Sequence, residues 1–325
     1  MKKILVIGYG QIGQQAAAGL LAAGHSVSLM TRSEKPGLDS RLQWIQGDAL
    51  QRDEVQRAVA GHDVVFACFH ASDYDSRIWS RTLPIMEANV LDAAAARGAL
   101  VVFPESVYGF AAAARLLSDD VQPAPADPKG VIRTQLLEAR RRHAATTLSV
   151  MAGDLIGPGA AAASSVIRFS ITDRLAAGAR PLLLAAPRVP HALTSIEDLS
   201  ASMIWAAEHA AQVVEPSGHR LLIAPSSAPT LEEVSDWTCT CLGIEPRKPR
   251  VVPAWLTRTM GLFSRPVKEI SRLAPIWRRP NELETSAELS QALGAPVPWQ
   301  QSVAAMLEST TATVQAKAAA ASRAA

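Results

Sequence analysis

The chain has 325 residues, of which 48% are apolar and 19% are charged, and its 32 basic and 30 acidic residues leave a net charge of +2. This composition is typical of a globular protein with a large core and excludes a disordered chain. So balanced a charge gives no signal for nucleic acid or for an anionic membrane, so we expect neither as a partner. The run Arg140-Arg141-Arg142 ends a predicted helix, and we expect it to be a solvated helix end.

The cysteines and the N-terminus bear on the cellular compartment. Three cysteines in a chain of this length argue against a disulfide framework and favour a reducing compartment. Cys239 and Cys241 diverge on a predicted helix and have no second Cys/His pair nearby, so we expect no metal site. The first strand runs into a glycine turn without a leader segment, and the apolar runs are too short to span a bilayer. We therefore expect a cytoplasmic protein.

In chain order, the first half alternates between predicted strands and helices. The predicted strands are 3–7, 26–30, 42–46, 63–69, 100–103 and 147–151, and the predicted helices are 11–23, 53–60, 78–97 and 131–143. Pro84 predicts a kink or a late start in the third helix. Because parallel neighbours need crossover helices, this alternation predicts an α/β fold with a doubly wound parallel sheet of the Rossmann type.

The second half is less regular. Beyond Gly157-Pro158-Gly159 the prolines become denser, and the predicted elements are loops at 187–191 and 246–253 and helices at 196–211 and 230–242. We divide the chain into an NAD(P)-binding domain (1–155), a smaller, mixed substrate-facing lobe (156–310) that can return strands or helices to the main sheet, and an Ala-rich tail (311–325). The lobe is expected to cap the carboxyl ends of the strands, where such folds bind ligands.

The residues Gly8-Tyr9-Gly10-Gln11-Ile12-Gly13 form a G-x-G-x-x-G motif between the first strand and the first helix. Gly8 permits the tight turn, Gly10 lets a pyrophosphate approach the backbone, and Gly13 lets the helix pack on the strand. The start of the helix then offers free N–H groups and a partial positive charge to the phosphates. The motif predicts that these six residues bind a dinucleotide, although an ordinary strand–helix turn could also carry three glycines.

The end of the second strand distinguishes the two nicotinamide cofactors. An acidic residue there would bind the adenosine ribose and favour NAD(H), but this chain has Thr31-Arg32-Ser33. Arg32 can pair with a 2′-phosphate, and the two hydroxyls can donate hydrogen bonds to it. We therefore favour NADP(H) over NAD(H). The alternative is that Arg32 is a solvated loop residue.

Several further segments resemble motifs of one family in both order and spacing. These segments are Gly47-Asp48-Ala49, Cys68-Phe69-His70, Val107-Tyr108-Gly109, 153–159, 191–198 and 284–296. The chain resembles the short-chain dehydrogenase/reductase superfamily, in its extended, NAD-dependent epimerase/dehydratase-like branch, as far as about Leu307. The resemblance implies that the cofactor is lined by Asp48, Ala49, Cys68, Phe69, His70, Pro104, Lys129 and Asp154. His70 could instead be a packed loop histidine.

The catalytic Y-x-x-x-K pair of this family is replaced here. At the expected spacing, Lys129 stands in the Tyr position and Arg133 in the Lys position. Arg133 can hold a ribose or phosphate but cannot relay a proton. Lys129 is an acid/base candidate if neighbouring positive charge lowers its pKa, or else a surface lysine that follows a proline-rich loop. Tyr108 is a second candidate acid, and Ser106 offers the only hydroxyl in the turn where the family carries its Ser/Thr.

Three functions are compatible with these residues. The first is an atypical NADP(H)-dependent oxidoreductase that acts on a small carbonyl or hydroxyl substrate, with Lys129, Tyr108 or water supplying the proton. The second is a non-catalytic dinucleotide sensor or scaffold. The third is a nucleotide-sugar epimerase or dehydratase, which His191 disfavours because many such enzymes have Arg there. A homodimer through the helices at 78–97 and 131–143 is possible, as in many relatives.

Overall fold

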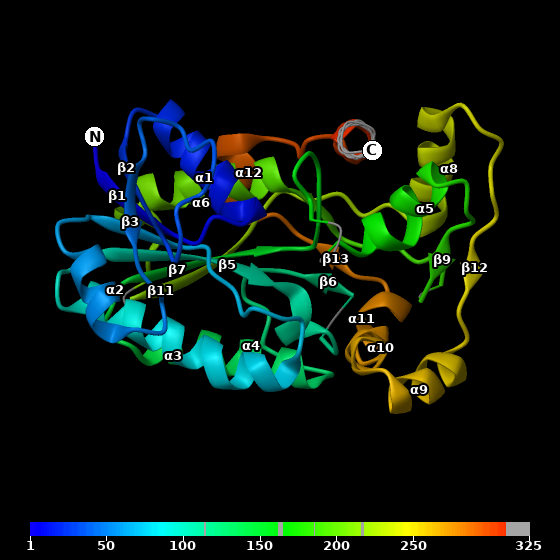
Figure 1. The fold of residues 1–325 in the computed structure, drawn as a ribbon, viewed down its shortest axis with the longest axis horizontal. Coiled ribbons are helices and arrows are strands. Elements are labelled where there is room, and N and C mark those ends of the chain that lie inside the picture. The colour runs from blue at the N-terminus through cyan, green and yellow to red at the C-terminus, as the bar shows by residue number, and fades with distance from the viewer. Residues whose placement is uncertain (114, 162–164, 185, 216–217, 310–325) are drawn as a thin grey trace, which may run out of the picture.

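The fold is built around one parallel sheet (Figure 1). The computed structural model describes residues 1–113, 115–161, 165–184, 186–215 and 218–309. The seven strands lie in the order β11–β7–β5–β4–β1–β2–β3, and every neighbouring pair is parallel. They are β1 (Lys3–Ile7), β2 (Ser26–Thr31), β3 (Gln43–Gln46), β4 (Val64–Ala67), β5 (Leu100–Ser106), β7 (Thr147–Ala152) and β11 (His219–Ile223). The predicted doubly wound parallel sheet is confirmed.

Helices cover both faces of the sheet (Figure 1). One face carries α1 (Gln11–Ala22), α6 (Ile196–Glu208) and α12 (Ala287–Leu293), and the other carries α2 (Arg52–Val59), α3 (Ser76–Ala95) and α4 (Pro128–Arg142). The strands β1, β4 and β7 are predominantly apolar and almost entirely buried because helices cover both faces of the sheet. β1 lies between β2 and β4, so the chain leaves this point of the sheet in opposite directions. Doubly wound sheets bind ligands at such a switch point.

A lobe of short elements packs over the carboxyl ends of the strands. Its strands form three two-stranded parallel sheets, β8 with β10, β9 with β12 and β6 with β13. The elements are η1 (Val107–Phe110), β6 (Leu116–Leu117), β8 (Asp154–Ile156), η2 (Arg168–Thr172), α5 (Asp173–Ala176), β9 (Leu182–Leu183), β10 (Leu193–Ser195), α8 (Leu231–Leu242), β12 (Arg250–Val251), α9 (Ala254–Phe263), α10 (Arg265–Ser271), α11 (Ala274–Arg278) and β13 (Glu282–Leu283). The short helix α7 (Ala210–Val213) follows α6 instead, and its Val213 belongs to the core of the sheet. Residues 299–309 are also helical, and Val303 and Met306 join the core of this lobe.

The structure corrects several sequence-based expectations. The seventh strand, β11, and the helices α9, α10 and α11 were not predicted. The predicted helix 196–211 ends at Glu208, because the His209 ring stacks on Trp205 and its Nδ1 lies 2.9 Å from the Trp205 carbonyl oxygen. α3 runs through Pro84 without ending there.

The prediction that Arg140, Arg141 and Arg142 form a solvated helix end is wrong for Arg140. Arg141 and Arg142 are exposed, but Arg140 is 1% exposed and pairs with buried carboxylates. The predicted Ala-rich tail lies outside the described residues. In the described part of the chain, no helix combines the length and the apolar character needed to cross a membrane.

Candidate functional site

The glycine turn has the geometry that its sequence predicts. Gly8 has a φ of +96°, and a Cβ added there would lie 2.8 Å from the carbonyl oxygen of Cys68. A Cβ on Gly13 would lie 2.1 Å from the carbonyl oxygen of Gly8, so the helix could not approach the turn. A Cβ on Gly10 would meet no atom within 4 Å, so Gly10 borders open space. Gly8 and Gly13 are therefore required by the turn itself, whereas Gly10 is free to serve a ligand.

The start of α1 is open to an anion. Its N-cap is Gly10, which makes no side-chain capping bond, and its first turn contains no acidic residue. The Gln11 side chain accepts a hydrogen bond from the backbone N–H of Ala161 at 2.8 Å, which links the turn to the loop after β8. Uncapped N–H groups at the positive end of a helix are suited to a phosphate. The cradle therefore fits the pyrophosphate of a dinucleotide.

A cavity of about 450 Å³ extends from this turn along the carboxyl ends of β4, β5 and β7, and we call it the first cavity. It contains many of the residues predicted to bind cofactor or to act in catalysis. These are Gly10, Gln11, Ile12, Cys68, Phe69, His70, Pro104, Ser106, Tyr108, Arg133 and Asp154. Its lining also includes Tyr74, Trp79 and Glu105, which no sequence motif indicated.

The other predicted cofactor residues lie outside the lining of the first cavity. The Thr31 hydroxyl donates to the carbonyl oxygen of Ser33 and accepts from Trp44 Nε1, both at 2.9 Å, so it supports the loop. Arg32 and Ser33 are exposed beside it at the end of β2. Asp48 accepts a hydrogen bond from the N–H of Leu50 at 3.0 Å. The remaining predicted residues are Gly8, Tyr9 and Gly13, in the turn, and Ala49, which is buried.

A buried ion network forms one wall of the first cavity. The Arg140 guanidinium donates to both carboxylate oxygens of Glu87, at 2.6 and 2.7 Å, and to Glu105 at 2.8 Å. Arg133 Nε lies 3.4 Å from the other oxygen of Glu105. Glu105 is therefore paired with two cations. A buried carboxylate needs a positively charged partner in order to remain charged. The Arg133 side chain is 12% exposed and lines the cavity, so its guanidinium can be reached by a ligand there.

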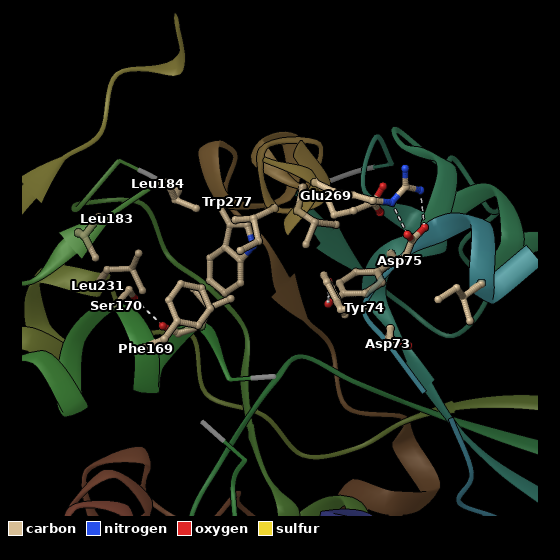
Figure 2. A pocket seen from close by; sticks show the side chains of 16 residues that line it. Asp73, Tyr74, Asp75, Phe169, Ser170, Leu183, Leu184, Leu231, Glu269 and Trp277 are labelled. Carbon is tan, nitrogen blue, oxygen red and sulfur yellow. Dashed lines mark hydrogen bonds and ion pairs between the residues drawn. The ribbon is translucent and has the colours of Figure 1, made fainter. Parts of the chain in front are cut away.

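A second cavity, of about 480 Å³, adjoins the first (Figure 2). The two cavities share Asp73, Tyr74 and Tyr108. The Tyr74 hydroxyl donates to the Tyr108 hydroxyl at 2.7 Å, so the pair forms the junction between the cavities. Burial raises the pKa of Tyr108 to about 12, against the opposing effect of the hydrogen bond from Tyr74. Tyr108 is thus a protonated hydroxyl at neutral pH.

Lys129 lies beneath this junction. It is 1% exposed, so the alternative of a surface lysine is wrong. Its ammonium group forms an ion pair with Glu269 of α10 and lies 4.2 Å from the centre of the Tyr74 ring. The described lining residues of the two cavities do not include Lys129. The structure therefore places the Lys129 ammonium over the face of the Tyr74 ring and outside the described linings of the cavities.

Asp154 at the start of β8 is the most perturbed carboxyl group of the first cavity. Burial raises its pKa from the ordinary 3.8 to about 7, although the backbone N–H groups of Ile167 and Val166 partly oppose this shift. The negative charge of Asp154 also acts to raise the pKa of Tyr108. A carboxyl group that titrates near neutral pH beside a tyrosine hydroxyl is characteristic of functional sites.

The two conspicuous histidines differ in their surroundings. The His70 ring lines the first cavity and packs edge-on against Trp79, with ring centres 4.5 Å apart. His191 is 2% exposed and packs against Trp277, and burial lowers its pKa to about 4. His191 is therefore neutral at physiological pH and provides no positive charge for a substrate phosphate.

Comparisons with known proteins agree with this geometry. A family model described as NAD(P)H-binding matches residues 8–119. No curated protein sequence matches the chain. The structure of the Bordetella bronchiseptica enzyme WbmH in complex with NAD+ is 16% identical, with a TM-score of 0.73 over 95% of this chain and 98% of that one. The Thermotoga maritima UDP-glucose 4-epimerase, with UDP-glucose, is 13% identical, with a TM-score of 0.75 over 96% and 99% of the two chains.

A third structure, the UDP-glucose 4-epimerase of Thermus thermophilus complexed with NAD, is 16% identical, with a TM-score of 0.68 over 94% of this chain and 98% of that one. The similarity extends over nearly the full length of all three chains. Residues 8–119 therefore match a family described as NAD(P)H-binding, and the whole chain has the fold of these NAD-bound and UDP-glucose-bound structures, as the resemblance to the extended short-chain dehydrogenases/reductases predicted.

Proposed function

We propose that this protein is an NADP(H)-dependent oxidoreductase that interconverts a carbonyl and a hydroxyl group. The observation that carries the proposal is the junction of the two cavities. The first cavity begins at the glycine turn, the second has no contact with that turn, and the Tyr74–Tyr108 pair belongs to both. A substrate in the second cavity would thus meet a proton donor at the point where it faces the cofactor.

Tyr108 is the proposed acid. When bound, NADP(H) supplies or accepts the hydride at the carbonyl carbon. In the reductive direction the Tyr108 hydroxyl gives its proton to the carbonyl oxygen, which yields the alcohol. The Tyr74 hydroxyl donates a hydrogen bond to the oxygen of Tyr108 and so stabilises the phenolate that remains until solvent returns the proton. Arg133 would hold the ribose or a phosphate, and the Lys129 ammonium would position Tyr74.

The first test is the oxidation of NADPH in the presence of a panel of aldehydes and ketones. Tyr108→Phe removes the proton and is expected to lower kcat by about 100-fold or more, while the Kd for NADPH stays within twofold. Thr240→Val, which removes an exposed hydroxyl group of α8 outside both cavity linings, is the control. No turnover with any carbonyl substrate, or an unchanged kcat in Tyr108→Phe, would refute the proposed reaction.

The preference for NADP(H) is tested separately. Arg32 is exposed at the end of β2 and is proposed to pair with the 2′-phosphate. Arg32→Ala is expected to weaken NADPH binding about tenfold and to leave NADH binding unchanged. Equal loss of both cofactors, or tighter binding of NADH by the unaltered protein, would show that the cofactor is NAD(H), as in the NAD-bound structures above.

A second candidate function is that of a nucleotide-sugar epimerase or dehydratase. It is supported by the UDP-glucose 4-epimerases that share the fold. Such an enzyme also transfers hydride but returns it to the same substrate, so it would turn over without net consumption of NADPH. Calorimetric titration with UDP-glucose distinguishes the two functions, because only the second requires tight binding of a nucleotide sugar.

A further inference from the structure

We infer that the second cavity binds an uncharged, predominantly hydrocarbon carbonyl compound or alcohol and excludes nucleotide sugars. This inference rests on the proposed function, because it names the substrate class of the same site. Nine of the sixteen lining residues are aliphatic or are Phe or Trp, among them Phe169, Leu184, Leu231 and Trp277. Figure 2 shows these side chains around the hollow. These four come from separate segments of the lobe, so the cavity is apolar on several sides.

Most polar side chains of the lining already have hydrogen-bond partners within the protein. Arg265 forms two hydrogen bonds with the carboxylate of Asp75. Glu269 accepts hydrogen bonds from the N–H and hydroxyl of Ser76 as well as from Lys129 and Arg272. The Ser170 hydroxyl donates to the carbonyl oxygen of Val166 within the same helix. These partners leave little hydrogen-bonding capacity for a polar ligand.

The charges in the lining are unfavourable for a diphosphate. The described lining residues include three carboxylates, Asp73, Asp75 and Glu269, and one cation, Arg265. Arg265 is already paired with Asp75, and the nearby cations Lys129 and Arg272 are already paired with Glu269. A nucleotide sugar would bring two negative charges toward these carboxylates without an available guanidinium or ammonium group. His191, which stands where many nucleotide-sugar enzymes have Arg, is held neutral by burial. The site therefore disfavours this substrate class electrostatically.

The hydroxyls of Tyr74 and Tyr108 lie at the other end of the cavity and define the orientation of the substrate. A carbonyl oxygen can bind at this junction while its apolar portion extends toward Trp277 and Leu184 (Figure 2). Each methylene group that enters an apolar cavity improves binding by about fourfold. Affinity should therefore increase with the length of the hydrocarbon chain.

The test is a series of 2-alkanones from 2-butanone to 2-decanone, with binding measured calorimetrically in the presence of NADP+ so that no turnover is needed. We expect Kd to fall by roughly three- to fourfold per methylene group until the cavity is full. UDP-glucose should not bind. Binding of UDP-glucose more tightly than 2-decanone, or a Kd independent of chain length, would overturn the inference.

A pair of variants locates this binding. Leu184→Lys places a charge at the cavity wall. It is expected to weaken the binding of 2-decanone at least tenfold and to leave the Kd for NADPH unchanged. Leu182→Lys makes the same change two residues away, at a side chain that is 37% exposed and outside the lining. Its Kd for 2-decanone should stay within twofold of that of the unaltered protein. Equal effects of both variants would contradict the assignment. Binding of 2-decanone without any reduction would refute the proposed function but not the substrate class.

A second inference rests on different residues. We infer that α9 docks onto an anionic lipid surface. Trp255, Leu262 and Phe263 are 67%, 78% and 90% exposed. Together with Thr259 they occupy positions i, i+4, i+7 and i+8 of α9, so they share one face of the helix. An apolar face turned to solvent on this scale marks an interaction surface, and Trp is characteristic of the membrane interface.

The charge around α9 favours lipid over a protein partner. Residues 247–279 contain nine of the 32 Lys and Arg residues and only one acidic residue, Glu269. Exposed cations among them include Lys248, Arg250 and Lys268. Figure 1 shows α9 at a corner of the molecule, away from the sheet. The net charge of +2 of the whole chain conceals this local excess, which complements an anionic headgroup layer.

Co-sedimentation with vesicles tests the second inference. The protein should sediment with phosphatidylcholine vesicles that contain a quarter phosphatidylglycerol, and much less with phosphatidylcholine alone. Phe263→Glu should reduce this binding about tenfold, whereas Leu116→Glu, at a residue that is 49% exposed on β6, should not. Absence of binding to anionic vesicles, or dimerisation in solution that Phe263→Glu abolishes, would overturn the inference.

Discussion

Two glycines of the same turn have different physical requirements. A Cβ on Gly13 would collide with the carbonyl oxygen of Gly8, whereas a Cβ on Gly10 would meet no protein atom. We therefore expect Gly13→Ala to destabilise the fold, by about 2 kcal/mol or more. Gly10→Ala should keep its melting temperature but weaken NADPH binding at least tenfold, because the added methyl group occupies the space that the pyrophosphate needs. Thermal unfolding and fluorescence titration of both variants measure these effects.

The contrast between the two variants is the informative result. If Gly10→Ala bound NADPH with unchanged affinity, the start of α1 would not be the phosphate site, and the first cavity would need another ligand. Gly24→Ala is the control for strain alone, since Gly24 has a φ of +80° but is remote from the turn. It should lower stability without any effect on cofactor affinity.

Asp154 should make stability depend on pH. Its folded pKa of about 7 lies above the ordinary value of 3.8, because burial penalises the charged carboxylate. The folded state therefore holds the proton more tightly, and this contribution is complete below about pH 4 and is lost as pH rises through about 7. Asp154→Asn cannot ionise, so it should be more stable than the unaltered protein at pH 8, by at most about 4 kcal/mol, and nearly equal at pH 4.

Urea unfolding of the cofactor-free protein at both pH values measures this difference. Asp236→Asn, a change at an exposed position of α8, should leave the difference between the two pH values unchanged. A parallel pH dependence in Asp154→Asn and the unaltered protein would show that the carboxyl group is not perturbed.

Some residues of the candidate site could be identified from the sequence and others could not. The glycine turn could be located because its glycines, strand and helix are contiguous in the chain. The burial of Lys129 could not, because its partner Glu269 lies 140 residues away, on a helix that no periodicity predicted. Tyr74 was missed for a similar reason: it lies in the loop after β4, and only its contact with Tyr108, 34 residues away, brings it to the junction of the cavities.

At the scale of elements, the regular half of the chain was the predictable half. Strands β1, β4 and β5 of the central sheet contain short apolar runs, so the signal for them is local in the sequence. β11 begins with two polar residues, His219 and Arg220, and its pairing partner β7 is distant in the sequence, so no local pattern marks it as part of the sheet. The segments α9, α10 and α11 lack a buried apolar stripe of helical spacing, since part of α9 faces solvent.

Arg140 holds α4 to α3 and to β5. Its guanidinium binds the buried carboxylates of Glu87 and Glu105 and the Ser149 hydroxyl, and lies 3.9 Å from the centre of the Phe103 ring. Arg140→Met removes the counterion of the buried Glu87 and leaves Glu105 with Arg133 alone, and it is expected to destabilise the protein by about 3–5 kcal/mol. Arg141→Met, at the exposed neighbouring position, should cost less than about 0.5 kcal/mol.

Urea unfolding of these two variants gives the free energies directly. An effect of Arg140→Met no larger than that of Arg141→Met would show that the two carboxylates take up protons at little cost. In that case the network would not be needed to hold the helices on the sheet.

At the scale of the whole molecule, one buried ion pair joins the sheet domain to the lobe. Lys129 of α4 and Glu269 of α10 are 1% and 2% exposed at their side chains, and Ser76 at the start of α3 donates to the same carboxylate. Burial alone would raise the pKa of Glu269, but the hydrogen bonds from Lys129 and Ser76 outweigh it and hold this pKa below its ordinary value. The stabilisation is therefore present above the ordinary pKa of glutamate and is lost as pH falls through the lowered value.

Removing one partner of this ion pair should destabilise the protein more than removing both. Glu269→Gln leaves the Lys129 ammonium buried without a counterion, so we expect a loss of about 3–5 kcal/mol and faster proteolysis within residues 254–279. The double variant Lys129→Met/Glu269→Met buries apolar groups of similar size and should cost less than Glu269→Gln alone. Urea unfolding and limited proteolysis measure the two effects.

The same double variant tests whether Lys129 is itself the acid. If Lys129 only positions Tyr74, the double variant should retain carbonyl reduction within about tenfold, with its pH profile unchanged, while Tyr108→Phe loses about 100-fold or more. If Lys129 supplies the proton, the double variant should lose activity as completely as Tyr108→Phe does. The proton donor would then have to reach the substrate from beneath Tyr74, which would require α10 to move away from α4 during turnover.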